Sequence, residues 1–142
     1  MVNKQIFQLI DFARRLPHFP KLLREDQVMI VKCGWNEILI ASVAFRSVEV
    51  SFNYIFNVSS IYFMKKIFVQ YIEGDRKSSD VKPQLMCLGT NFTLHRNSAQ
   101  QAGVAPIFDR ILSELSLKMK RLEIDRIEMC CLKSIIIFNP GL

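Results

Sequence analysis

The chain has 142 residues, which is enough for one domain at most. Half of its residues are hydrophobic and 23% are charged, a balance that excludes a disordered chain and supplies enough apolar side chains for a buried core. The net charge of +6 is moderate, and by itself it does not distinguish a nucleic-acid partner from an acidic protein surface.

The four cysteines do not indicate a metal site. They stand at positions 33, 87, 130 and 131, without a Cys-x-x-Cys pair and without a histidine at metal-ligand spacing. Cys33, Cys130 and Cys131 lie in apolar runs, so we expect three buried thiols in a reducing compartment.

Two helices are predicted in the first third of the chain. Residues Asn3 to Leu16 carry apolar side chains at helical spacing, and Pro17 ends this helix because it lacks an N–H. Asp26 can cap a second helix from Gln27 to about Val48, which is apolar nearly all round. Such a helix is typical of the middle of a layered helical domain, where it is covered on more than one side.

The next segment, Ser51 to about Gln70, has a β-prone composition without a clear period. The apolar stretch Ser51 to Ile72 also raises the question of a membrane span. Lys65 and Lys66 near its middle make that alternative unfavourable, because charged side chains are costly inside a bilayer.

A strand pair is predicted within Leu85 to Leu94, because the sequence Leu88-Gly89-Thr90-Asn91 between its halves is turn-like. Asn97 or Ser98 is expected to start a short helix that Gly103 ends.

An amphipathic helix is predicted from Ile107 to Leu122, with Pro106 suited to its first turn. Asp125 and Glu128 resemble a capping box for a last helix. The apolar face of that helix is predicted to hold Met129, Leu132, Ile135 and Ile136.

No catalytic set is found in the sequence. His18 and His95 are far apart, neither has a serine, cysteine or carboxylate convincingly placed beside it, and there is no phosphate-binding loop. We therefore expect that the protein is not an enzyme.

Several blocks of the sequence resemble one family. Residues 12–19, followed by Leu22 and Asp26-Gln27, are similar to the signature of nuclear hormone receptor ligand-binding domains, and residues 34–42 continue it. The branch of the retinoid X receptor and insect ultraspiracle is matched by residues 95–99, 103–104 and 107–110, and its insect members by residues 84–88 and 132–136. The matched blocks cover residues 3–48 and about 84–140.

The resemblance implies an all-α fold, a fragment of the family's three-layer helical sandwich with a short β-hairpin. Residues 1–142 would be a partial ligand-binding domain, running from the family's third helix into its eighth, with no DNA-binding domain in this chain. Residues 51–70 interrupt the match, and we interpret them as an atypical insert, either translated intron or an error of the gene model. Phe, Ile, Asn, Tyr and Lys, whose codons are AT-rich, dominate this segment.

The resemblance also implies a ligand site around Arg46. The family uses an arginine at this place to meet the carboxylate of an acidic ligand, and its planar fork suits that task. An exposed arginine at a helix end is the alternative. The positions that match the family's pocket are Gln5, Trp35, Asn36, Val43, Arg46, Leu88, Val104, Ile107 and Phe108. For each apolar member taken singly, a place in the core is the favoured interpretation. Val43 replaces an aromatic residue of vertebrate members, which leaves the ligand open.

A coregulator groove is implied on the first two helices, where an amphipathic Leu-x-x-Leu-Leu helix lies in the family. The matching positions are Phe7, Ile10, Arg14, Gln27, Val28 and Lys32. Arg14 stands where most members have lysine, and Arg24 replaces a leucine, which weakens one wall. Ordinary solvated charge on the two helices is the alternative.

Arg110 and Glu114 lie on a helix that contributes to the family's dimer interface, although a simple (i, i+4) ion pair on an exposed face accounts for them equally well.

The function implied is ligand-dependent regulation of transcription in the nucleus by a heterodimeric receptor. The expected ligand is a hydrophobic small molecule or lipid, acidic where it meets Arg46, with no metal or other cofactor. The expected partners are coactivator and corepressor helices and a second nuclear receptor. DNA would be contacted only through a domain absent here, and no contact with a membrane is expected. The alternative is a truncated form that titrates coregulators or has no function.

Overall fold

The computed structural model describes the backbone of residues 2–72, 85–89 and 91–139, and the side chains of these ranges except residues 2–3 and 51–72. Thr90, in the middle of the predicted turn, and the side chains of the proposed insert lie outside this description.

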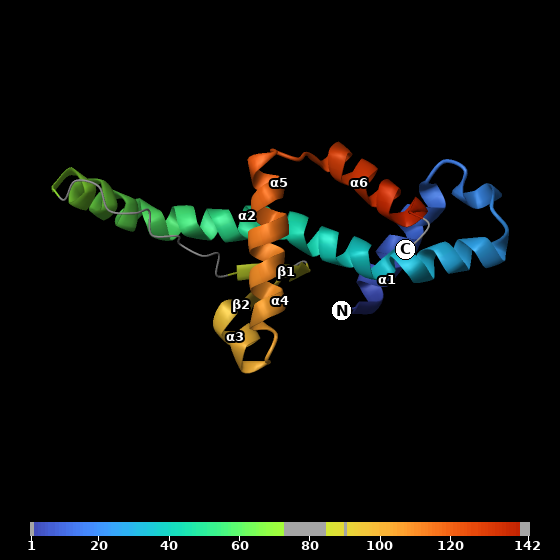
Figure 1. Ribbon diagram of the computed structural model, residues 1–142, viewed down its shortest axis with the longest axis horizontal. Coiled ribbons are helices and arrows are strands. Elements are labelled where there is room, and N and C mark those ends of the chain that lie inside the picture. Colours follow the sequence, from blue (N-terminus) through green and yellow to red (C-terminus); the bar gives the residue numbers. More distant parts are fainter. Residues whose placement is uncertain (1, 73–84, 90, 140–142) are drawn as a thin grey trace.

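One long helix, α2 (Arg24–Ile72), organises the fold (Figure 1). It contacts two other helices, the first strand of the hairpin and a helical rod, and the rod crosses it (Figure 1). The rod consists of the three consecutive helical segments between Ala105 and Arg121. The elements in chain order are α1 (Val2–Arg15), the 3₁₀ turn η1 (Phe19–Lys21), α2 (Arg24–Ile72), β1 (Leu85–Gly89), β2 (Phe92–His95), α3 (Arg96–Gln101), α4 (Ala105–Arg110), the π-helical turn η2 (Ile111–Ser116), α5 (Leu117–Arg121) and α6 (Arg126–Phe138).

The central place of α2 agrees with its apolar sequence. It packs against α1, α6, β1, η2 and α5, which covers it on more than one side. It also keeps apolar side chains exposed near its beginning, with Met29 63% and Trp35 43% accessible. Its part Arg24–Val50 is long and apolar enough to cross a membrane, but the core helix of a soluble protein meets the same criterion.

In the described part of the chain, the buried side chains form three groups along α2. The first joins α1, α2 and α6, the second joins α2 to the rod and α6, and the third joins the hairpin to the rod. Small residues at the crossing, Ala41, Ala44 and Ser47, bring the other elements close to the α2 backbone. The buried members are Leu9, Ala13, Phe19, Ile38 and Ile137; Ala41, Ala44, Met119 and Met129; and Met86, Ala99, Phe108 and Leu112.

The segment of β-prone composition, Ser51 to about Gln70, has a helical backbone. The backbone of α2 continues as a helix through Ile72. Adding residues to an existing helix requires no new nucleus, so a weak local preference for extended backbone is easily overridden.

The strand pair is confirmed, and it contains an irregularity. Leu85 pairs with His95, Cys87 with Thr93 and Gly89 with Phe92, so that the register shifts between Cys87 and Gly89. Leu88 therefore has no partner in the antiparallel ladder. It occupies the position of the extra, unpaired residue of a β-bulge.

The predicted helices of the second half are confirmed with local differences. The N-cap of α3 is His95, whose Nδ1 accepts from the N–H of Asn97 at 3.2 Å, so neither Asn97 nor Ser98 starts that helix. The amphipathic helix begins at Ala105 and passes through the π-helical turn before it ends at Arg121.

The capping box of α6 is present in full. The Asp125 carboxylate accepts from the N–H of Glu128 at 2.8 Å, and the Glu128 carboxylate accepts from the N–H of Asp125 at 3.0 Å. On the apolar face of α6, Met129 is buried as predicted, but Ile135 is 68% exposed and Ile137 takes its place in the core.

The expectation of three buried thiols was also wrong. Cys33, Cys130 and Cys131 are exposed, and Cys87 is partly buried. In a helix, neighbouring residues point about 100° apart. Gly34 faces the backbone of Ile137 in α6, so Cys33 next to it faces away.

Candidate functional site

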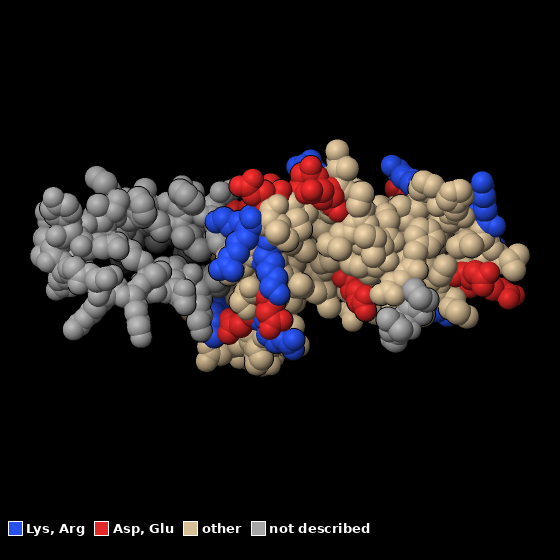
Figure 2. All heavy atoms as spheres, turned by 45° about the horizontal axis from the view of Figure 1, so that its top comes forward, with Lys and Arg blue, Asp and Glu red and all other residues tan. Residues whose placement is uncertain are grey.

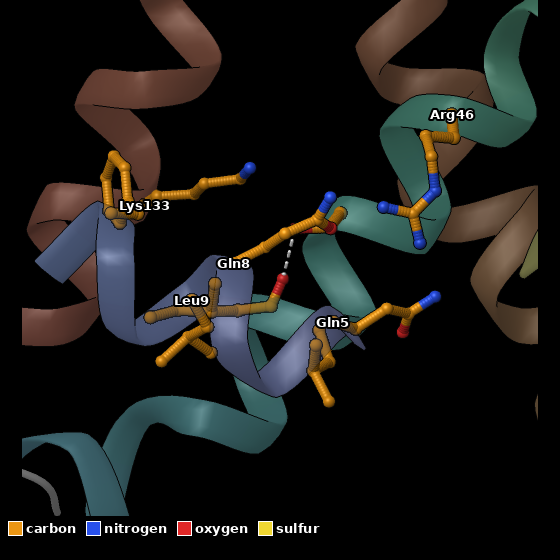
Figure 3. Close-up of a pocket in the computed structure, with 9 residues that line it drawn as sticks. Gln5, Gln8, Leu9, Arg46 and Lys133 are labelled. Atoms are coloured by element: carbon orange, nitrogen blue, oxygen red, sulfur yellow. Dashed lines mark hydrogen bonds between the residues drawn. The ribbon is translucent and has the colours of Figure 1, made fainter. Parts of the chain in front are cut away.

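Arg46 lies in the middle of α2 and points its guanidinium into a cavity between helices (Figure 3). Its Nη2 donates to the carbonyl oxygen of Leu88 at 3.2 Å. Its Nε is buried and has no hydrogen-bond partner among the described residues. Because α2 continues well beyond Arg46, the alternative of an exposed arginine at a helix end is wrong. A buried N–H without an acceptor is costly, so this site can take a further acceptor.

The cavity has a volume of about 70 Å³ and lies between α1, α2 and α6. Two cationic side chains, Arg46 and Lys133, line it together with the amides of Gln5 and Gln8, and Figure 3 shows the four converging on one space. The remaining lining residues are Leu9, Phe12, Ile38, Leu39 and Ser42. Among the described residues, none of those that line the cavity is a carboxylate, so the electrostatic potential of this lining favours an anion.

Lys133 reaches the cavity from α6. Its ammonium lies 5.7 Å from the centre of the Phe12 ring, a cation–π distance. Burial lowers the pKa of Lys133; the Cys130 thiol acts in the opposite direction, and the positive charge of Arg46 lowers it further. An anion bound in the cavity would compensate both effects, since it stabilises the charged form of the lysine.

Ser42 contributes an acceptor to the cavity. Its hydroxyl already donates to the carbonyl of Ile38 at 2.7 Å (dashed line in Figure 3). The donors that remain for a ligand are therefore the N–H groups of Arg46 and Gln5 that are not bonded to Leu88, and those of Lys133 and Gln8.

The hairpin is attached to α2 beside this cavity. The Ser47 hydroxyl donates to the carbonyl of Val43 at 2.7 Å and accepts from the N–H of Cys87 at 2.9 Å. One residue further on, the Leu88 carbonyl accepts from Arg46 and also from the side-chain amide of Gln5 in α1. The strand therefore lies against both helices through its backbone.

The residues predicted for the pocket fall into three groups. Gln5, Arg46 and Leu88 are joined by hydrogen bonds at the cavity. Val43 and Leu88 pack against the cluster that contains Phe108, which is 2% exposed. The remaining positions, Trp35, Asn36, Val104 and Ile107, are exposed and do not line the cavity.

Lys133, Gln8 and Ser42 were not among the sequence candidates. For Lys133 a signal was available, because it lies four residues from both Met129 and Ile137 and therefore shares the buried face of α6. A lysine at such a position indicates a partner or a cavity. Nothing in the sequence distinguished Gln8 and Ser42 from ordinary helix residues.

The groove positions lie on the accessible surface of α1 and α2. Phe7 is 71% exposed, Ile10 38% and Val28 46%, with the charged side chains of Arg14 and Lys32 also exposed. Gln27 is partly buried and donates to the carbonyl of Leu22 at 2.9 Å, which ties the start of α2 to the preceding turn.

Charged side chains of both signs gather along the rod of α4, η2 and α5, beside a broad uncharged area (Figure 2). Arg110 and Glu114 form an ion pair on the rod at 3.4 Å, with both side chains more than half exposed. Arg96 and Asp109 form a closer, two-bonded pair at 2.8 Å, which raises the pKa of Arg96 and joins α3 to α4. Within the described part of the chain, no three His, Cys, Asp or Glu side chains gather to hold a metal.

The fold is a helical domain built on one central helix, with a hairpin beside that helix and a cationic cavity between α1, α2 and α6. The profile for the ligand-binding domain of nuclear hormone receptors matches residues 1–142, and the chain belongs to this family. Members of the family are generally transcription factors and generally not enzymes.

Its relatives include the ultraspiracle proteins of insects. The chain is 45% identical to protein ultraspiracle of Drosophila melanogaster and 47% identical to the ultraspiracle homologue of Manduca sexta, over 100% and 97% of its length. These alignments cover 27% and 26% of the two relatives, so the chain spans about a quarter of their length. The solved ultraspiracle ligand-binding domain from Drosophila melanogaster superposes with a TM-score of 0.74 at 44% identity, covering 99% of this chain and 46% of that one.

Proposed function

We propose that this chain is part of the ligand-binding domain of a ligand-dependent nuclear receptor, which regulates transcription in the nucleus by binding a hydrophobic small molecule with an acidic group. The observation that carries the proposal is the buried Nε of Arg46. Among the described residues it has no acceptor, and none of those that line the cavity beside it is a carboxylate. The chain spans only about a quarter of the length of its relatives, so the activity of a whole receptor is likewise proposed for it.

The cavity suits the acidic head of such a ligand. Its volume of about 70 Å³ is far below the roughly 300–1,000 Å³ of pockets that enclose whole drug-sized ligands. A carboxylate there would accept from Arg46, and Lys133 would balance its charge. Leu9, Phe12, Ile38 and Leu39 would contact the first carbons of an apolar tail.

Binding of a simple carboxylic acid tests this proposal. We expect octanoate to bind more tightly than 1-octanol, and Arg46→Met to remove that preference with little effect on the alcohol. Charge-assisted hydrogen bonds contribute about 1.5–3 kcal/mol, so the expected loss is on the order of tenfold to a hundredfold. Arg14→Met, an exposed arginine on α1, is the matched control. Equal affinities of the intact protein for the acid and the alcohol would contradict the proposal.

The exposed apolar and basic side chains of α1 and α2 support a second part of the proposal, the binding of coactivator or corepressor helices. Phe7, Ile10 and Val28 offer apolar contacts, and Arg14 offers a positive charge for the negative C-terminal end of a bound Leu-x-x-Leu-Leu helix. Pull-down with such a peptide is expected to fail for Arg14→Glu. Arg15→Glu is the control, because Arg15 is also exposed but pairs with Asp11 at 2.8 Å. Equal binding by Arg14→Glu and the unmodified protein would contradict this part.

The small size of the cavity supports a second candidate function, that of a protein which titrates coregulators without sensing a ligand. Peptide binding that is unaffected by octanoate would favour it over ligand sensing. In either case the proposed partner in the full receptor is a second nuclear receptor, for which the exposed rod face around Arg110 and Glu114 is the proposed contact.

A further inference from the structure

The Leu88 carbonyl is the point where α1, α2 and the hairpin meet. It accepts from the side-chain amide of Gln5 and from Nη2 of Arg46. The register of the hairpin shifts between Cys87 and Gly89, which leaves Leu88 out of the ladder. Its carbonyl is therefore free to accept from the two helices, and its two lone pairs match the two donors.

This shared acceptor restricts the guanidinium of Arg46. One of its five N–H bonds is directed at Leu88, and because the group is planar, that bond fixes the direction of the others. The Nε that remains unpaired among the described residues belongs to the same plane. Whatever holds the Leu88 carbonyl in place therefore also sets the direction in which Arg46 presents its unused donors.

We propose that Gln5 is a positioning residue, which orients Arg46 for an anionic ligand by holding the Leu88 carbonyl. The inference rests on the proposed function, because it concerns the same anion site. Gln5 acts through this carbonyl, so α1 becomes part of the site. Gln8 lies one turn further along α1 and lines the same cavity, but it has no hydrogen bond to Leu88.

Hydrogen exchange in the absence of ligand tests the linkage. Gln5→Met keeps the length of the side chain and removes its donor, and we expect faster exchange of the amides of residues 85–95 because the hairpin loses its attachment to α1. Gln8→Met is the matched control and is expected to leave this exchange unchanged. Unaltered exchange in Gln5→Met would overturn the proposal.

The pair octanoate and 1-octanol tests the effect on the anion site. Gln5→Met should weaken octanoate on the order of fivefold, within the range of coupled contacts, and leave 1-octanol unchanged. In an Arg46→Met background the same change should have no effect on octanoate. If Gln5→Met weakens the binding of octanoate and 1-octanol equally, or weakens octanoate just as much in the Arg46→Met background, the role of Gln5 is merely structural and the proposal is overturned.

The two experiments also separate this inference from the function on which it rests. If the unmodified protein binds octanoate no more tightly than 1-octanol, the proposed function fails. Faster exchange in Gln5→Met would then still establish the linkage from Gln5 to the hairpin.

Discussion

The hydroxyl of Ser116 donates a hydrogen bond to the backbone carbonyl of Ala44 at 2.8 Å, in the interior of the protein. Ser116 is the last residue of the π-helical turn η2, and Ala44 is fully buried in α2. The bond joins the rod to the central helix where the two cross, next to the buried side chains of Ala41 and Met119.

Replacing Ser116 by alanine should therefore destabilise the protein. The loss of a buried hydrogen bond is expected to lower the free energy of unfolding by about 1–2 kcal/mol, measured by urea denaturation. Ser113→Ala is the control, since Ser113 belongs to the same turn but is exposed. Equal stability of the two variants would show that the bond to Ala44 contributes nothing.

Gly34→Ala should be tolerated and stabilising. An added Cβ would meet the Ile137 Cα at 3.5 Å and the Ile136 carbonyl at 3.6 Å, which are ordinary van der Waals contacts. Alanine is favoured over glycine inside a helix by about 1 kcal/mol, so we expect a gain of up to about that size in urea denaturation. Gly34→Leu should instead separate α2 from α6 and destabilise the protein. A loss of stability in Gly34→Ala would mean that α2 and α6 lie closer together than these distances indicate.

Asp125→Ala should weaken the start of α6. The change removes the acceptor for the N–H of Glu128, and the loss of an N-cap typically costs about 1 kcal/mol. Asp125→Asn retains a capping oxygen and is expected to keep most of the stability. The free energies of unfolding of the two variants can be compared directly. If the asparagine variant is as unstable as the alanine variant, the cap is not the cause.

Lys133→Met should change the dependence of stability on pH. Burial lowers the pKa of Lys133 below its ordinary value of 10.5, so in the alkaline range beneath that value the folded state loses this proton before the unfolded state does. The unfolded state then binds more protons, and the free energy of unfolding gains a contribution that rises with pH. The methionine variant should lack that rise.

The exposed Lys118 provides the control for this measurement, because Lys118→Met is expected to keep the rise. Lys120, whose pKa burial also lowers, contributes the same background to every variant compared. If the free energies of unfolding of the unmodified protein and of Lys133→Met change with pH in parallel, burial of the charged Lys133 side chain does not destabilise the folded state.

The local signals in the sequence predicted most elements correctly. Pro17 after the first helix, the turn-like residues after Leu88, and the reciprocal capping by Asp125 and Glu128 are interactions between near neighbours. The family resemblance of residues 3–48 and 84–140 placed Arg46 in a pocket. That prediction agrees with the position of Arg46 at the cavity, although ligand binding itself remains a prediction.

Which side of an apolar helix is buried was less predictable. Cys33, Gly34, Ile135 and Ile137 all stand in apolar runs, yet only Gly34 and Ile137 lie at the contact between α2 and α6. A run without polar breaks carries no periodicity, so the sequence contains no marker of the face that a partner helix covers.

The sequence by itself determined where most helices lie, the capping box of α6 and the hairpin, because these depend on backbone preferences and hydrogen bonds within a few residues. Only the tertiary structure decided that Lys133 meets Arg46 at one cavity, and that the Leu88 carbonyl leaves the ladder to bind Gln5 and Arg46. These groups come from segments far apart in the chain. Their proximity follows from how α1, α6 and the hairpin pack on α2, which no local pattern records.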